Sequence, residues 1–391
     1  MASLLPVSLF NAHPEYFACG SLNGGQRTTD QPCLTNPDVL RIITDNVLSL
    51  LAGNPEAQII SVTQNDNMNF CICKNCLAVD LAEGSHAGTM LRFVNAVADA
   101  VKDAGYLDVK IDTFAYQYTR TAPKITAPRD NVIVRLCTIE DCYAHAFNDA
   151  DCVMNSLLTK NFDNWAAICD NIYVWDYTTN YYNFLSPFPN FGNIQTNMQF
   201  FAEHNITGVY EEGNFAASSS NAEFAELRAY LLSKLLWDPF IDLDLEMNGF
   251  LQAYYGAGWQ YIREYIDMTS EKTGIYPTHS IIFSSTLNPG VLLLTNNEVK
   301  YMDDLWTNAK ALCNNDWQAV NIKLSELSWR YWKGCNMKSE FSRLQNPPVW
   351  QEANEKLYND MKAAGVTRFS ELKSITNKPD FTKPPYTWGV K

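Results

Sequence analysis

The stretch AQIISVTQNDN, residues 57–67, decides the fold class. Its apolar centre, Ile59 to Val62, is typical of a buried strand of a parallel sheet, and a polar cluster follows it directly. In parallel α/β folds, functional side chains gather where the strands end, because the loops there converge on one edge of the sheet. The same pattern elsewhere in the chain would therefore indicate an α/β protein with its site at that edge.

A helix comes before this strand, at residues 36–53. Asn36 is a good capping residue, Pro37 suits the first helical position, and Gly53 is typical of a helix end. Helix and buried strand follow each other closely, as in a βαβ unit.

The alternation of helix and strand recurs downstream. Helical spacing is found at residues 89–105, 155–169, 193–204 and 226–239, and strand patterns are found at 109–118, 131–142, 171–177 and 206–213. Such alternation predicts parallel βαβ units. With the first strand this makes five, whereas a closed barrel has about eight. We expect an α/β fold, a (β/α)8-type TIM barrel that lacks its first strands, with an open α/β sheet as the alternative.

The pattern changes near residue 240. Residues 298–313 and 316–335 have helical spacing with no strand pattern between them, and the Pro-rich tail at 377–391 looks extended. We expect a catalytic barrel domain at 1–240 and a mostly helical C-terminal region at 241–391.

Composition excludes some partners. Of 391 residues, 47% are hydrophobic and 18% are charged, and the net charge is −14. A negative field of this size disfavours nucleic acid and anionic membrane surfaces and suits a neutral glycan. A bilayer-spanning helix needs about 18 or more consecutive apolar residues, and the sequence has no such run, so no membrane insertion is expected.

The compartment is less clear from the sequence. The chain begins MASLLPVSLF, which lacks the basic n-region of a secretory signal peptide. We expect the full-length protein to be exported, to the periplasm or the cell surface, and a cytoplasmic location is the alternative. The 11 cysteines do not decide, because an odd count fits both reduced thiols and partial disulfide bonding.

Carboxylates, amides and aromatic side chains recur where the predicted strands end. They are Asn65, Asp66, Tyr116, Tyr118, Glu140, Trp175, Asp176, Tyr177, Glu211 and Glu212. Any one of the acids is equally well explained as a helix cap or turn former, but their recurrence at several strand ends favours a functional site.

Glycoside cleavage needs a carboxylic acid to protonate the leaving oxygen, and Asp66 and Glu211 come from different strands and could flank a bond. The tyrosines and Trp175 suit a platform for sugar rings, although core packing would equally explain Trp175.

The run CICKNC, residues 71–76, is a second feature. Three closely spaced thiols, Cys71, Cys73 and Cys76, can hold a structural zinc, form a disulfide or stay unliganded. The fourth zinc ligand would be His86, Cys137 or Cys142. A catalytic metal is disfavoured, because the chain has only five histidines.

Several stretches of the sequence resemble a known family. They are HPEYFA (13–18), CLTNPDVL (33–40), ISVTQNDN (60–67), CICKNC (71–76), Gly84-Ser85, FVNAVADAV (93–101), TFAYQYT (113–119), CTIEDC (137–142), YVWDYTTNY (173–181), GVYEEGNF (208–215) and LRAYLLSKLLWDP (227–239). Together they resemble the bacterial domain family from which glycoside hydrolase family 163 was founded, over roughly residues 10–260. Characterised members are endo-β-N-acetylglucosaminidases that cleave N-glycan cores.

The resemblance implies a (β/α)8-barrel glycosidase that needs no cofactor. By a looser similarity to β-hexosaminidases, Asn65 and Asp66 take the place of an adjacent acid pair, with Asp66 as the acid and Asn65 orienting the substrate acetamide. Glu211 and Glu212 remain alternative acids. Family members carry an N-terminal domain and earlier barrel strands before the first of these stretches, and this chain begins almost at it.

The hypothesis is a retaining glycosidase that acts on β-linked N-acetylglucosamine-containing glycans of the N-glycan type. A carboxylic acid supplies the proton, and the substrate acetamide, steered by Asn65 and Tyr177, assists. The first alternative is a non-catalytic carbohydrate-binding protein on an incomplete or retired barrel. The second is a metal-stabilised interaction module centred on the cysteine run.

Overall fold

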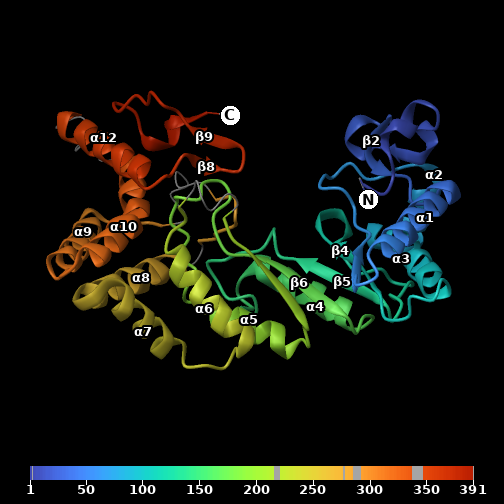
Figure 1. Ribbon diagram of the computed structural model, residues 1–391, viewed down its shortest axis with the longest axis horizontal. Coiled ribbons are helices and arrows are strands. Elements are labelled where there is room, and N and C mark those ends of the chain that lie inside the picture. The colour runs from blue at the N-terminus through green and yellow to red at the C-terminus, as the bar shows by residue number, and fades with distance from the viewer. Residues whose placement is uncertain (2, 215–220, 276–277, 285–291, 337–346, 391) are drawn as a thin grey trace. The chain divides into compact units, whose positions relative to one another are not determined.

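The computed structural model describes residues 1–391 except 2, 215–220, 276–277, 285–291, 337–346 and 391 (Figure 1). The helices are α1 Pro37–Gly53, α2 Lys74–Glu83, α3 His86–Asp103, α4 Val153–Ala166, α5 Ile194–Glu203, α6 Ala225–Trp237, α7 Leu243–Tyr255, α8 Trp259–Thr273, α9 Asn296–Ala311, α10 Asp316–Asn336 and α12 Pro347–Ala363. The strands are β1 Phe17–Cys19, β2 Arg27–Pro32, β3 Ile59–Ser61, β4 Lys110–Ala115, β5 Val132–Cys137, β6 Ile172–Tyr177, β7 Gly208–Glu212, β8 Arg368–Ser370, β9 Lys373–Ile375 and β10 Gly389–Val390.

The central sheet has five strands in the order β3-β4-β5-β6-β7. The pairs β3–β4, β4–β5 and β5–β6 are parallel. The order follows the chain without reversal, as in (β/α) barrels, whereas doubly wound sheets reverse at a switch point. The α/β class is therefore confirmed. A closed TIM barrel is not, because the strand order within the described residues is linear and ends at β3 and β7.

Strand β3, within the stretch at residues 57–67, is more exposed than the buried strand that the sequence predicts. β3 is an edge strand in the described part of the chain, hydrogen-bonded to β4 alone. Ile59 is 39% exposed, and burial returns only at Val62, just after the strand. An apolar run predicts burial when both neighbours are present, and β3 has one.

The helix before β3 forms as the sequence predicts. The Asn36 side chain accepts hydrogen bonds from the backbone N–H groups of Asp38 and Val39, at 2.9 and 3.4 Å. α1 packs against α3, and α3 packs against β4 and β5. The residues that α3 buries, Val94, Val97 and Val101 among them, recur every three or four positions, so one stripe of this helix faces the sheet.

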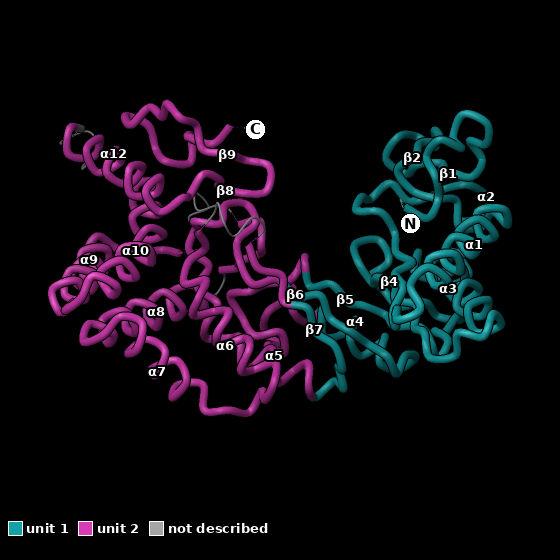
Figure 2. The backbone as a smooth tube through the Cα atoms, in the orientation of Figure 1, with its two compact units in different colours: residues 1–138, 157–176, 203–210 teal, residues 139–156, 177–202, 211–391 magenta. Residues whose placement is uncertain are grey.

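The chain forms two compact units (Figure 2). Unit 1 comprises residues 1–138, 157–176 and 203–210, and unit 2 comprises residues 139–156, 177–202 and 211–391. The sheet strands β3, β4 and β5 belong to unit 1. The last residues of β6 and β7 belong to unit 2. The predicted domain boundary at residue 240 remains a prediction.

The C-terminal part of unit 2 is mainly helical. Helices α9 and α10 lie where the sequence predicts them, at 298–313 and 316–335. The predicted tail is only partly extended, because Pro385–Trp388 form a 3-10 helix before β10, which belongs to the short antiparallel sheet β10-β9-β8. Leu327, Tyr331, Phe369 and Trp388 share one buried core that joins this sheet to the helices. Within the described residues, we find no helix with the length and apolarity needed to cross a bilayer.

Candidate functional site

The ends of β3 and β4 bring two of the sequence-predicted residues together. The Tyr116 hydroxyl donates a hydrogen bond to Asp66 Oδ1 at 3.0 Å, and the Gln117 side-chain amide donates to the Tyr116 oxygen at 3.0 Å. Tyr116 is buried and Asp66 is exposed. The result is a solvent-accessible carboxylate, one oxygen of which accepts a hydrogen bond from a phenol.

The backbone around Tyr116 is fixed by buried polar groups. Gln64 donates to the Tyr116 carbonyl at 2.7 Å, and the Thr119 hydroxyl donates to Gln64 Oε1 at 3.0 Å. Gln117 has a φ of 51°, a left-handed conformation that is uncommon for a residue with a side chain. Non-glycine residues in this conformation cluster at functional sites, where surrounding contacts hold them. No pattern in the sequence pointed to Gln117.

Asn65, the neighbour of Asp66, turns toward strand β2. Its side-chain amide donates to the Asp30 carbonyl at 2.7 Å. Its backbone N–H donates to Gln31 Oε1 at 3.0 Å, and the Gln31 amide donates back to the Asn65 carbonyl at 2.8 Å. Asn65 therefore anchors the loop that carries Asp66 to strand β2.

Tyr118 lies in a hollow beside a histidine–aspartate pair. The hollow is lined by residues that include Phe70, Asp80, His86 and Tyr118. His86 Nδ1 lies 2.7 Å from Asp80 Oδ2, and the Phe70 ring lies 4.0 Å from the His86 ring and 5.2 Å from the Tyr118 ring, centroid to centroid. Burial, then the charge of Asp80, raises the pKa of Tyr118 well above its ordinary value, so the phenol stays protonated. Phe70 and Asp80 were missed as candidates, and His86 was considered only as a zinc ligand, because these residues lie on a loop and helices rather than at strand ends.

Trp175 packs within the sheet. Its ring meets Phe114 edge to face at 5.6 Å and Tyr210 at 4.5 Å, centroid to centroid. The Arg135 guanidinium lies 5.9 Å from the Trp175 ring centroid. These contacts account for an aromatic residue at this position, so a sugar-stacking role of Trp175 remains a prediction. The next residue, Asp176, is buried and accepts a hydrogen bond from the Thr138 hydroxyl at 2.5 Å.

The remaining strand-end candidates lie in unit 2. Glu140 is exposed, whereas Tyr177 is buried and meets the Tyr181 ring edge to face at 5.7 Å. Glu211 and Glu212 are half-buried, and the Glu212 carbonyl accepts from the Tyr181 hydroxyl at 2.8 Å.

Alternation along β7 puts Tyr210 and Glu212 on one face of the strand and Glu211 on the other. Asp66 belongs to unit 1 and Glu211 to unit 2, so the opposition of these two carboxylates remains a prediction.

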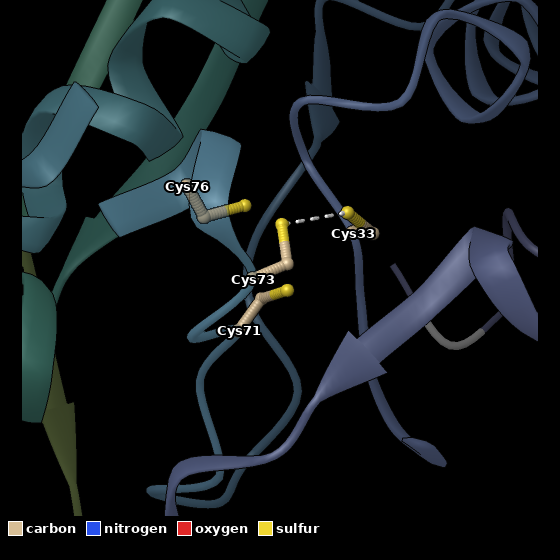
Figure 3. Close-up of side chains that lie close together, drawn as sticks. All are labelled: Cys33, Cys71, Cys73 and Cys76. Carbon is tan, nitrogen blue, oxygen red and sulfur yellow. Dashed lines mark hydrogen bonds between the residues drawn. The ribbon is translucent and has the colours of Figure 1, made fainter. Parts of the chain in front are cut away.

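The cysteine run forms a compact cluster with a fourth thiol (Figure 3). The sulfur atoms of Cys33, Cys71, Cys73 and Cys76 all lie within 4.8 Å of one another. Cys33 and Cys73 are 3.7 Å apart, sulfur to sulfur. The fourth position is thus taken by Cys33, and not by His86, Cys137 or Cys142 as the sequence suggested. The sequence separates Cys33 from the run by a helix and a strand, so local spacing could not find it.

Backbone contacts join the cysteine run to β1, and β1 pairs with β2, the strand directly before Cys33. The N–H of Ile72 donates to the Cys19 carbonyl at 2.8 Å, and Gly20 and Cys71 form an isolated antiparallel bridge. Cys73 caps α2, and Cys76 lies in its first turn, where backbone N–H groups favour negative charge. All 11 cysteines lie in the described part of the chain, and none forms a disulfide there.

The thiols influence one another strongly. Hydrogen bonds, first from Cys71 and then from Cys76, lower the pKa of Cys33 far below its ordinary value. Their contact with Cys33 raises the pKa of Cys71 and Cys76. Without a metal, the cluster holds one thiolate that accepts hydrogen bonds from neighbouring S–H groups. Binding of a divalent cation would release the remaining protons and leave four thiolate ligands. The donor set, four convergent sulfurs, is that of a closed structural zinc site.

Comparisons with known proteins place the chain in a family. A mutant of the O-GlcNAc hydrolase from Thermobaculum terrenum is a similar solved structure, with a TM-score of 0.42 and 8% sequence identity over 85% of this chain and 76% of that one. No curated protein matches the sequence. A family model described as "Domain of unknown function (DUF4838)" matches residues 1–267, more than half of the chain. The chain belongs to the DUF4838 family.

Proposed function

We propose that the protein is a glycoside hydrolase of the family 163 type, which cleaves β-linked N-acetylglucosamine-containing glycans of N-glycan type with retention. The observation that carries the proposal is the exposed Asp66 carboxylate at the end of β3, held through one oxygen by Tyr116. The sequential order of five parallel strands, which is that of (β/α) barrels, supports it. The motif series quoted above, which resembles endo-β-N-acetylglucosaminidases, gives the substrate class.

In this proposal Asp66 is the general acid. Its second oxygen gives a proton to the glycosidic oxygen as the bond to the anomeric carbon breaks. The carbonyl oxygen of the substrate's 2-acetamido group forms a new bond to the anomeric carbon from the opposite face. Water then opens this cyclic intermediate and gives its proton to the Asp66 carboxylate, and two inversions retain the configuration. Tyr116 keeps Asp66 oriented, and Asn65 anchors the loop.

The acid assignment is tested by comparing variants at the two candidate acids. Purified wild-type protein, Asp66→Asn and Glu211→Gln are assayed for oligosaccharide release from an N-glycosylated protein. Loss of a general acid typically reduces the rate about 10²- to 10⁴-fold, and we expect that loss for Asp66→Asn. The matched control is Asp103→Asn, which neutralises an exposed carboxylate at the end of α3. Should only Glu211→Gln lose activity, the acid is Glu211, and full activity in both variants would refute the mechanism.

The exposed edge of the sheet favours one other candidate function. β3 lies at an edge with Ile59 exposed, as on a barrel with missing strands. A carbohydrate-binding protein without catalysis would fit such an incomplete barrel. Calorimetry with a released N-glycan separates the two, because a binding protein gives heat of binding in the wild type and no turnover.

We also propose that Cys33, Cys71, Cys73 and Cys76 together hold a structural zinc ion. Four thiol sulfurs within 4.8 Å of one another match the donors of a closed tetrahedral site with no position open for water. The ion would fix the segment after β2 to the start of α2. It takes no part in the proposed reaction.

A further inference from the structure

A second group of nitrogen and sulfur ligands lies in unit 2. Cys142, His145, Cys152 and His279 each contribute one ligand atom, and these atoms all lie within 4.8 Å of one another. We propose that these four side chains bind a structural zinc ion, in a site separate from the cysteine cluster of unit 1. From the sequence, Cys142 is only a candidate fourth ligand of the Cys71–Cys76 run, and no sequence pattern points to His145 or His279.

The distances suit a single tetrahedral ion. Cys142 Sγ lies 3.4 Å from His145 Nδ1, and Cys152 Sγ lies 3.7 Å from His279 Nδ1. Zinc bonds of about 2.0–2.3 Å put neighbouring ligand atoms about 3.3–3.8 Å apart. Each pair alone could be a simple S–H to nitrogen hydrogen bond. A common centre is indicated because all four atoms converge.

The Nε2 atom of His145 has a hydrogen-bond partner, as the ring nitrogen that does not bind the metal usually has in metal-bound histidines. Its Nε2 lies 3.2 Å from the Gly274 carbonyl oxygen, at the end of α8. A carbonyl only accepts, so Nε2 carries the proton, and Nδ1 presents its lone pair toward Cys142.

Asn155 holds the loop that carries two of the ligands. This buried side chain accepts from the Cys142 N–H at 2.9 Å and donates to the carbonyls of Cys142, His145 and Ala146 at 2.9, 3.1 and 3.0 Å. Cys152 immediately precedes α4, where the helix N-terminus favours a thiolate. The site is therefore shaped by its surroundings before any ion enters.

The burial and the donor types indicate which ion and which role. Cys142 and Cys152 are fully buried, and His145 is only 4% exposed. Two sulfurs and two imidazoles are donors that suit zinc, and four protein ligands leave no position for a reacting water. The role is structural.

The ion would anchor a segment that supports one of the strand ends. Residues 278–284 form neither helix nor strand, and carbonyls of this segment accept from the backbone N–H groups of Tyr143 and Tyr181, each at 2.7 Å. The Tyr181 hydroxyl in turn donates to the Glu212 carbonyl at the end of β7. Zinc at His279 would thus fix the segment that positions Tyr181.

The test is the zinc content of the purified full chain, measured by elemental analysis without added chelator. We expect two zinc ions per chain in the wild type, one in Cys152→Ser and one in His279→Ala. Cys313→Ser is the matched control, because this unit 2 cysteine lies outside both ligand groups, and it should keep two. Cys73→Ser should keep the unit 2 ion and lose the other, which separates the two sites.

A second readout guards against variants that fold poorly. Hydrogen exchange of peptides that contain the Tyr143 and Tyr181 amides should become faster in His279→Ala and stay unchanged in Cys313→Ser. His279 is half-buried in an irregular segment, so its loss disturbs the core less than that of Cys152. One zinc ion in the wild type, lost only with Cys73, would overturn the proposal, as would two zinc ions retained in both Cys152→Ser and His279→Ala. None of these readouts depends on glycosidase activity.

Discussion

Glu83 is a fully buried carboxylate at the end of α2, and each of its oxygens has partners. Oε1 accepts from Arg92 at 2.6 Å and from the Thr126 hydroxyl at 2.5 Å. Oε2 accepts from the backbone N–H groups of Ile125 and Thr126 at 3.0 and 3.1 Å. Burial by itself would raise the pKa of Glu83, but the hydrogen bonds, those from Thr126 foremost, outweigh it and lower the pKa.

This balance predicts how stability depends on pH. A carboxyl group whose pKa is lower in the folded state stabilises the fold above its unfolded pKa, about 4.3 for glutamate, and this contribution is lost as pH falls through the folded pKa. Glu83→Gln should therefore lower the free energy of unfolding by about 1–3 kcal/mol at pH 7, with the difference from wild type shrinking below about pH 4. Urea unfolding across pH measures it. The control Glu355→Gln, at an exposed position of α12, should show no such trend, and a pH-independent difference for Glu83→Gln would contradict the assignment.

At the residue scale, the sequence identified the polar strand ends but not their partners. Asp66 and Tyr116 were both visible as strand-end residues, and the structure joins them by a hydrogen bond. Cys33 and His279 were not identified, because each meets its cluster through tertiary contacts between segments far apart in the chain. The spacing of residues along the chain identifies only ligands that are close in sequence, whereas these ligands come together through the fold.

At the scale of elements, Gly88 lets α2 and α3 approach closely. A Cβ atom at this position of α3 would lie 2.1 Å from Glu83 Cγ and 2.3 Å from Glu83 Cβ. Glu83 cannot move aside cheaply, because its carboxylate is fixed by the hydrogen bonds just described. The glycine is therefore required by packing, although glycine disfavours a helix interior.

Gly88→Ala should destabilise the protein in spite of its better helix propensity. The propensity gain is about 1 kcal/mol, and the overpacking cost against Glu83 should exceed it, so we expect a net loss of about 1–2 kcal/mol. Thermal unfolding is the measurement. Gly53→Ala in α1 is the matched control, because no described atom lies within 4 Å of its added Cβ, and it should be neutral or stabilising. Equal effects of the two substitutions would show that packing at Gly88 is not the cause.

Most elements of the central sheet could be predicted from the sequence, and their exposure could not. Periodicity located α1, α3 and α4 and the strands β4, β5 and β6 close to their observed bounds. It failed for β3, since an apolar run does not say whether a second strand will cover it. It also missed the short strands of the C-terminal sheet, because segments of two or three residues are too short to show a period.

At the scale of the whole molecule, the described residues of each compact unit include one group of zinc-type ligands. Both groups join segments that are distant in the chain, and both adjoin a predicted strand-end site. In unit 1, the cluster residues Cys71 and Cys76 line the hollow that contains Tyr118. In unit 2, the segment after His279 supports Tyr181. A large negative net charge, −14, is compatible with binding divalent cations and a neutral glycan together.

Removing zinc from unit 1 should lower the stability of the fold as a whole. The ion would close a loop between Cys33 and Cys71 that encloses α1 and β3, and α1 packs on α3 against the sheet. Binding energy of a structural zinc is folding energy, and losing several kcal/mol lowers the melting temperature of a unit of this size by about 5–15 °C. Cys73→Ser should show this fall together with loss of one zinc ion per chain, and a high-affinity zinc chelator should reproduce the fall in the wild type.

Cys19→Ser is the sharpest control, because Cys19 packs against the same cluster but is outside its four ligands. If Cys19→Ser and Cys73→Ser lose equal stability and neither changes the zinc content, the four sulfurs are a buried thiol core and not a metal site.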